Sequence, residues 1–484
     1  MMQMLRARFW LALLVVSILG LSTLGIEVNL VITTLILTAT IILAYKVIFR
    51  VFLPRPAYTD IAFWVLFFIS IDTLSLAVLA LLDLPYWERV FPHLRDTALF
   101  SKTLLCYALF TGSFVLAASV TPGRGASFPH QSRLYSPQIW LLIALALTVM
   151  KAFINHFVLG IPLIRWGFEP VEIKSYATNL SLAQMVRIFS LLQGKVIIFA
   201  VATWIIRAPS LMRARMRLIV LLPIALALLF GFTTERGQIL AIAIATVVFA
   251  DLVRWKGRFL TKKLIIISVI LLFIANGVTN LLEGYIVAGR LPNISEWPLV
   301  RFFSFHPHPI YVGGTVISWV DTQRVDKLYG SSYIDALKGL IPSQVWGSKL
   351  PTLDRWFIHL FNPVAAELGQ GMGLSPVGEG YLNFGVPGVF FEGVLLGLVV
   401  CFIRKLLLYM QWPKAFKPFL YAGILPSAAI GIYRFGFYYI IDTLLLYIIG
   451  MVVLMIVVSM LLGVIRSQKI ELLPQQTTLR PPSG

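Results

Sequence analysis

The chain has little charge: only 13% of its 484 residues are Asp, Glu, Lys or Arg, whereas 59% are hydrophobic. Soluble domains contain about 25% charged and about 45–50% apolar residues, so this composition excludes an ordinary soluble domain. Acidic residues are scarcest, 21 against 40 Lys and Arg, which leaves a formal net charge of +19. Runs of about 20 apolar residues cross a bilayer as helices that satisfy their own backbone hydrogen bonds. We therefore expect an all-α, polytopic membrane helical bundle.

Cysteine is rare, and metal and nucleotide signatures are missing. Cys106 and Cys401 both fall in apolar runs, which indicates neither a disulfide framework nor a thiolate metal site. The His306-Pro307-His308 sequence has no third ligand at a regular spacing. The glycine-rich stretch 369–380 follows no expected strand and precedes no Lys, unlike a nucleotide-binding loop. We expect no metal and no cofactor.

Twelve apolar runs are candidates for membrane spans. They lie at about 9–25, 29–49, 61–82, 99–120, 139–159, 188–206, 218–233, 237–253, 264–282, 381–403, 418–433 and 437–465. The first run has no clear cleavage signal before Glu27, so we interpret it as a retained span. The expected division is spans 1–9 in 1–282, a large extracytoplasmic loop at 283–380, spans 10–12 in 381–466, and a disordered cytoplasmic tail at 467–484. Within the loop, 313–320 and 331–341 are apolar enough for short interfacial or re-entrant helices.

The positive charge lies beside the expected spans. If the N-terminus is cytoplasmic, the inner segments contain 23 of the 40 cations and only three carboxylates, Asp60, Asp251 and Glu471. Such a distribution is typical of the positive-inside rule, so no nucleic-acid partner is expected. An alternative for the clusters at 213–217 and 254–263 is a basic partner-binding surface. Twelve spans place both termini in the cytoplasm of a multi-pass inner-membrane protein.

Asp72, Glu392, Arg434 and Asp442 are charged residues at membrane depth, in or next to the expected spans. Charges at membrane depth are costly, so these side chains should face the bundle interior and mark a polar cavity. Arg434 and Asp442 flank the last outer turn, where pairing with each other is an alternative.

Glu379 ends the glycine-rich stretch at the expected outer mouth of the bundle. It is a candidate general base, with helix capping or a salt bridge to a loop arginine as the alternative. The glycines around it allow the backbone to approach either a ligand or a neighbouring helix closely.

Arg236 lies in the short polar segment 233–238 between two apolar runs. It is either part of a turn at the headgroup level, beside Glu235, or a ligand for a lipid-linked phosphate, whose oxygens match the planar guanidinium fork.

The long loop supplies further candidate phosphate ligands, Arg290, Arg301 and Arg355, for which a solvated surface is the alternative. Arg355 and His359 are four residues apart and would share one face of a helix. His306 and His359 are candidate bases, with a structural role as the alternative.

Three stretches together resemble the Wzy-type polysaccharide repeat-unit polymerases, such as the O-antigen and enterobacterial common antigen polymerases. These are 232–251, with its Thr-Glu-Arg-Gly turn before a long outer loop, the Ile-Pro…Trp…Lys segment within Gly330–Pro351, and Leu374–Gly385. The motifs cover about 230–390. The Arg-(ten residues)-Gly pattern of some O-antigen polymerases does not occur at Arg165, Arg290, Arg301 or Arg355, so no two-loop catch-and-release scheme is carried over.

The resemblance implies glycosyl transfer from undecaprenyl diphosphate to a sugar hydroxyl of a new lipid-linked repeat unit, at the outer face of the inner membrane. The residues suit a metal-independent reaction, in which Arg236, Arg290, Arg301 and Arg355 bind the diphosphate and Glu379, His306 or His359 is the base. Expected partners are undecaprenyl-diphosphate-linked oligosaccharides, membrane lipid, a chain-length regulator and a flippase.

Three other functions remain open: an O-antigen ligase-type glycosyltransferase, a lipid-linked oligosaccharide flippase, and an assembly partner without catalysis. Transporters commonly contain two repeated halves with short loops. This chain has no internal repeat and concentrates its polar residues after the ninth run, which favours an enzyme.

Overall fold

The structure is a computed structural model. It describes residues 2–51, 60–81, 96–120, 137–153, 196–197, 199–218, 244–255, 308–338, 353–363, 366, 373–409, 416–440, 444–461 and 463. These residues are 88% helical and contain no strand, which confirms the all-α class.

Five described helices are long and apolar enough to cross a membrane, and each coincides with an expected span. They belong to α1 (Met2–Thr23), α2 (Leu30–Val51), α3 (Ile61–Leu81), α5 (Thr97–Ala118) and α18 (Val386–Tyr409). Shorter apolar helices occur in α6 (Pro137–Phe153) and α20 (Leu445–Leu461). Several long apolar helices therefore indicate a membrane protein, while the total of about twelve spans stays a prediction.

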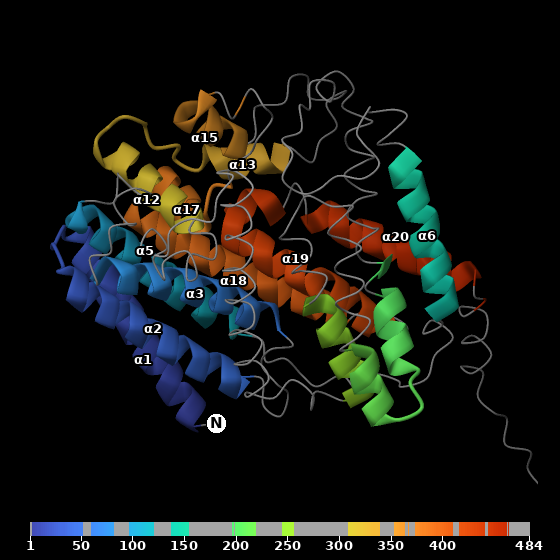
Figure 1. Cartoon of the computed structure of the whole chain (residues 1–484). Helices are drawn as coiled ribbons and strands as arrows, with labels where there is room; N and C mark the ends of the chain where they lie inside the picture. Colours follow the sequence, from blue (N-terminus) through green and yellow to red (C-terminus); the bar gives the residue numbers. More distant parts are fainter. Residues whose placement is uncertain are drawn as a thin grey trace, which may run out of the picture.

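Helix α5 lies at the centre of this bundle, against α1, α2, α3 and α18 (Figure 1). Its sequence is apolar around its whole circumference, as expected for a helix covered on all sides. Asp96 caps its first turn by accepting hydrogen bonds from the backbone nitrogens of Ala98, at 2.8 Å, and Leu99, at 3.3 Å.

Small residues on α18 allow its backbone to touch that of α5. A Cβ added at Gly393 would lie 2.8 Å from the Phe110 carbonyl oxygen, and one at Gly397 would lie 2.5 Å from that of Phe114. One turn further, the Cys401 thiol donates to the Ala117 carbonyl oxygen at 3.3 Å. This spacing of four residues is typical of close helix pairs in membranes.

One end of the bundle, called here the Glu379 end, is formed by α12 (His308–Asp321), α13 (Ser331–Lys338), α15 (Leu353–Phe361) and α17 (Pro376–Phe384) (Figure 1). The expected short helix at 313–320 lies within α12, and the described part of the one at 331–341 is α13. Much of the described part of the expected loop is helical, and most of α12 and α17 is buried in the bundle.

Glycines mark two boundaries near the expected spans. The run that was expected to start at 381 is divided by Gly385, whose φ of 67° ends α17 before α18 begins. Helix α19 (Phe416–Tyr439) contains a break at Gly436, with φ 70° and ψ −153°, which lies between the expected spans 418–433 and 437–465. In both cases a glycine in a left-handed conformation interrupts an otherwise apolar sequence.

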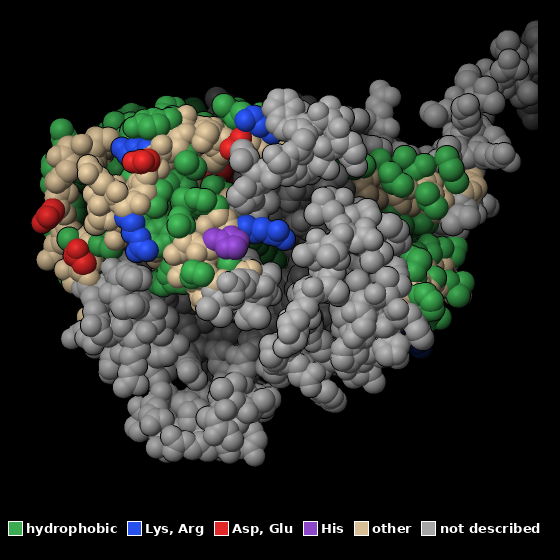
Figure 2. All heavy atoms as spheres, turned by 90° about the horizontal axis from the view of Figure 1, so that it is seen from above, with side chains coloured by type: hydrophobic (Ala, Val, Ile, Leu, Met, Phe, Trp, Pro, Cys, Tyr) green, Lys and Arg blue, Asp and Glu red, His purple; other side chains and the backbone are tan. Residues whose placement is uncertain are grey.

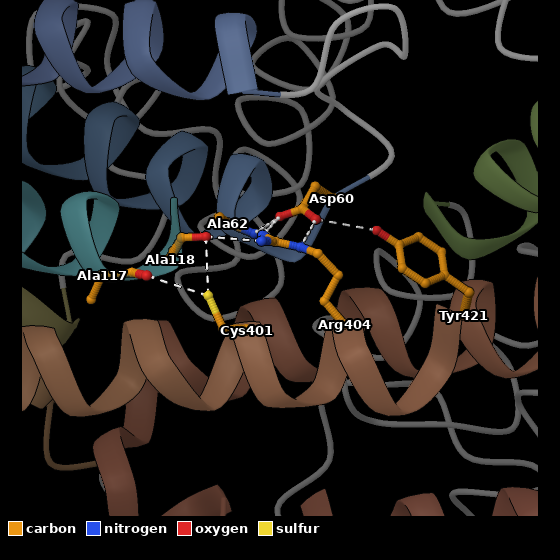
Figure 3. Close-up of polar contacts among 7 residues, drawn as sticks. All are labelled: Asp60, Ala62, Ala117, Ala118, Cys401, Arg404 and Tyr421. Carbon is orange, nitrogen blue, oxygen red and sulfur yellow. Dashed lines mark hydrogen bonds and ion pairs between the residues drawn. The ribbon is translucent and has the colours of Figure 1, made fainter. Parts of the chain in front are cut away.

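The opposite end, called here the Arg404 end, is held by a buried ion pair (Figure 3). Arg404 of α18 donates from Nε and Nη2 to the two Asp60 carboxylate oxygens, both at 2.8 Å, and from Nη1 to the Ala118 carbonyl oxygen, also at 2.8 Å. Asp60 also accepts from the Ala62 backbone nitrogen at 2.8 Å and from the Tyr421 hydroxyl at 3.4 Å. The pair therefore joins α3, α5, α18 and α19.

Candidate functional site: a buried carboxyl pair

Two glutamates meet inside the Glu379 end. Glu379 of α17 and Glu392 of α18 are both fully buried. The backbone N–H of Phe437 donates to Glu379 Oε2 at 2.8 Å and to Glu392 Oε1 at 3.0 Å. The two side chains, called here the carboxyl pair, thus share one hydrogen-bond donor.

Close approach of α17 and α18 brings the carboxyl pair together. A Cβ added at Gly380 would lie 2.7 Å from the carbonyl oxygen of Gly388, so only glycine fits where the two helices cross. Helix α17 is capped by Ser375, whose Oγ accepts from the Gly378 nitrogen at 3.1 Å, and Pro376 opens its first turn. This start places Glu379 in the first turn, next to the crossing point.

The shared donor depends on the break in α19. At Gly436 the chain leaves the helix, and a side chain there would lie 3.2 Å from Glu392 Oε1. The break directs the N–H of the next residue, Phe437, at the carboxyl pair rather than into the helix.

Helix α13 closes the site. The Tyr333 hydroxyl donates to Glu392 Oε2 at 2.8 Å, and the Ser332 hydroxyl donates to Glu379 Oε1 at 3.4 Å. Asn383 Nδ2 donates to Ser332 Oγ at 2.7 Å, which leaves the serine proton directed at Glu379. Burial, with the charges of Glu392 and Glu379, raises the pKa of Tyr333 well above its ordinary value, so this hydroxyl stays a donor at neutral pH.

The membrane-depth charges occupy the interior as expected where they are described. Asp72 of α3 is 5% exposed and Glu392 is fully buried. Arg434 of α19 is half-buried and interacts electrostatically with Asp72. Asp442 lies outside the described residues, so its pairing with Arg434 stays a prediction.

A second polar cluster lies at the rim of the same end. Asp321 of α12 accepts from Lys102 of α5 and from the Tyr381 hydroxyl of α17, both at 2.6 Å. The Lys102 ammonium group also lies 5.3 Å from the centre of the Tyr381 ring. The Lys102 and Asp321 side chains are about one-third exposed, at 37% and 36%, so this cluster ties α17 to α5 and α12 at the surface.

Arg355 and His359 share helix α15, as their spacing predicted, and both are exposed. The helix turns Phe357 and Phe361 towards α12, where their rings lie 5.3 Å from those of Trp319 and Tyr311. Since Arg355 and His359 lie off this apolar face, they point to the surface and not into the buried cluster. Figure 2 looks onto this end and shows basic and histidine side chains on its described surface.

Of the seven residues predicted for the site, the structure therefore buries Glu379 and exposes Arg355 and His359. The other four lie outside the described residues: Arg236, Arg290, Arg301 and His306.

The described glycines of the 369–380 stretch pack against protein. A Cβ at Gly373 would lie 2.7 Å from the Arg434 carbonyl oxygen, and one at Gly378 would lie 3.3 Å from Ser375 Oγ. Of the two roles considered for these glycines, close helix packing therefore applies to Gly373, Gly378 and Gly380.

Sequence reasoning missed the partners of Glu379. The sequence did contain a signal for Glu392. It follows Glu379 by thirteen positions, and the glycines between them allow the chain to turn and bring the two residues close together. Tyr333, Ser332 and Asn383 carried no such signal, since nothing in the sequence places α13 over α17.

No family model matches the chain, and comparisons with curated proteins and with solved structures return no match. Function is therefore inferred from the carboxyl pair and its surroundings. A buried carboxylate with fixed hydrogen-bond donors at a bundle end is suited to accepting a proton from a bound hydroxyl group.

Proposed function

We propose that the protein polymerises undecaprenyl-diphosphate-linked oligosaccharide repeat units at the outer face of the bacterial inner membrane. In this proposal the Glu379 end faces outwards, and the Arg404 end and both termini lie in the cytoplasm. The observation that carries it is the burial of Glu379, one of the three candidate bases from the sequence, among hydrogen-bond donors from α13 and α19. The long apolar helices and the sequence resemblance support the same assignment.

The reaction joins two lipid-linked glycans. The acceptor sugar hydroxyl gives its proton to Glu379 while its oxygen bonds to the anomeric carbon of the donor glycan. The bond from that carbon to the diphosphate oxygen breaks, and undecaprenyl diphosphate leaves with the electron pair. A positioned general base of this kind contributes about 10²–10⁴ to the rate.

The leaving diphosphate needs cations nearby, because negative charge develops on it as the bond breaks. Arg355 is exposed on α15 at the same end as Glu379, so it is available to a lipid headgroup. Arg236, Arg290 and Arg301 are proposed from the sequence for the same role, since the guanidinium fork matches phosphate oxygens.

The test is polymerisation in nanodiscs that contain purified protein and a synthetic undecaprenyl-diphosphate repeat unit, with products resolved on a gel. We expect a ladder that survives EDTA and is lost in a folded Arg236→Ala variant. Transfer of one finished glycan to a lipid A acceptor, with no ladder, would indicate a ligase. Movement of the lipid-linked sugar across proteoliposomes without any transfer would indicate a flippase.

A further inference from the structure

Glu392 has no role in the reaction as written so far, yet it lies beside the proposed base. We propose that Glu392 is a positioning residue that shares one proton with Glu379, so that the resting pair carries a single negative charge. This inference rests on the proposed function, because the pair is taken to receive the proton of the acceptor hydroxyl.

The geometry makes two full charges unfavourable. Both carboxyl groups are completely buried, and both accept a hydrogen bond from the same backbone N–H, that of Phe437. Like charges that share a buried site repel strongly, and carboxyl pairs in other proteins relieve the repulsion by retaining one proton.

The charged groups described on the neighbouring helices interact with other residues. On α19, the charge of Arg434 acts on Asp72 of α3.

Two ion pairs hold other charged residues on the helices around the carboxyl pair. On α13, Lys338 and Asp335 form an ion pair at 3.1 Å, and at the rim Lys102 of α5 pairs with Asp321 of α12 at 2.6 Å. Tyr333 supplies a neutral hydroxyl to Glu392. A retained proton lowers the charge of the buried pair and relieves the repulsion between the two carboxyls.

The donors differ between the two members. Glu392 accepts from Tyr333 at 2.8 Å, whereas the side-chain donor to Glu379, Ser332, is at 3.4 Å. The stronger donor favours the negative charge on Glu392 and the shared proton nearer Glu379. During transfer Glu379 passes the shared proton to Glu392 as it takes the proton of the acceptor hydroxyl, so the pair becomes neutral, and one proton returns to the outer water after the product leaves.

Proton sharing makes the two titrations depend on each other. Carboxyls that share a proton release their protons in two steps that belong to the pair, separated by more than about one pH unit. In Glu392→Gln the side chain keeps its shape and its one carbonyl oxygen can accept from either Phe437 or Tyr333, but the amide has no charge and no acidic proton. Glu379 then loses its partner and titrates in a single step at a new pH.

The experiment is an infrared pH titration of the protonated carboxyl band, in detergent, for wild type, Glu379→Gln and Glu392→Gln. Asp335→Asn is the matched control, because it removes a half-buried carboxyl of α13 that pairs with Lys338 and has no contact with the pair among those described. We expect each pair variant to replace two wild-type steps by one step that is displaced by on the order of one pH unit. A remaining step at its wild-type pH would overturn proton sharing. Circular dichroism and gel filtration establish that the variants are folded.

A kinetic arm separates this inference from the proposed function. In an active preparation, Glu392→Gln should change the shape of the pH–rate profile, and Glu392→Asp, which keeps a titrating carboxyl, should preserve it. A uniformly slower profile of unchanged shape would indicate a merely structural Glu392 and contradict the proposal. Coupled titration without any ladder would leave proton sharing intact and remove the polymerase assignment.

Discussion

Arg404 and Asp60, separated by 344 positions in the sequence, form a bidentate ion pair in which both side chains are almost completely buried. The guanidinium also binds the last turn of α5 through the Ala118 carbonyl oxygen. The pair thus fixes the start of α3, the end of α5 and the last turns of α18 in one arrangement (Figure 3).

Breaking this ion pair should strongly destabilise the fold. Arg404→Met leaves the Asp60 carboxylate buried without its cation, which costs about 3–5 kcal/mol. Lys102→Met is the matched control, because it breaks a half-exposed ion pair with Asp321, and such pairs contribute about 0–1 kcal/mol. Thermal unfolding in detergent measures both. Equal losses in the two variants would contradict this ranking.

The contact between α18 and α5 should not tolerate even a methyl group. In Gly397→Ala the new Cβ would lie 2.5 Å from the Phe114 carbonyl oxygen, so the helices must separate, at about 1–3 kcal/mol. Gly20→Ala in α1 is the control, since no atom lies within 4 Å of its new Cβ and alanine is the better helix former. The unfolding temperature should fall in Gly397→Ala and hold or rise in Gly20→Ala. An equal fall of the unfolding temperature in both variants would contradict the role given to the close contact between α18 and α5.

Alkaline pH should destabilise the protein through Tyr381. Burial, with the hydrogen bond to Asp321, raises the pKa of Tyr381 above its ordinary value of about 10. The unfolded chain therefore ionises first, and the contribution of Tyr381 is complete below pH about 10 and is lost as the pH rises further. Tyr381→Phe loses the hydrogen bond but cannot ionise, so its stability deficit should shrink between pH about 9 and about 11. A stability deficit of Tyr381→Phe that stays constant over this pH range would refute this.

The two bundle ends should lie on opposite sides of the membrane. Ile334 on α13 is 55% exposed, and Met212, beside the basic cluster 213–217 that the sequence places in the cytoplasm, is 66% exposed, whereas the native Cys106 and Cys401 are buried and should react little. We expect a membrane-impermeant maleimide to label Ile334→Cys in intact spheroplasts, and to label Met212→Cys only after permeabilisation. The reverse pattern would invert the proposed orientation and place Glu379 in the cytoplasm.

Hydropathy predicted the described spanning helices well, because a long apolar run has few alternatives to a helix in a bilayer. It missed the division at Gly385, since a glycine inside an apolar run signals neither packing nor a turn until its φ is known. The sequence identified Glu379 as a candidate base at the mouth of the bundle but did not identify its donors. The Phe437 N–H becomes a donor to Glu379 only because α19 is broken at Gly436.

The same limit applies to α15. The spacing of Arg355 and His359 predicted a shared helix, but the direction in which the helix faces is decided by Phe357 and Phe361 against α12. Tertiary packing of this kind cannot be deduced from the helix sequence alone.

The central claim is that Glu379 activates the acceptor hydroxyl. The most direct measurement is the initial rate of ladder formation for Glu379→Gln beside Asp335→Asn, in nanodiscs with the same lipid-linked repeat unit. Glutamine keeps the shape of the side chain but cannot take a proton, so the rate should fall by about 10²–10⁴ while Asp335→Asn stays near wild type. A folded Glu379→Gln protein that extends the ladder at the wild-type rate would contradict the account.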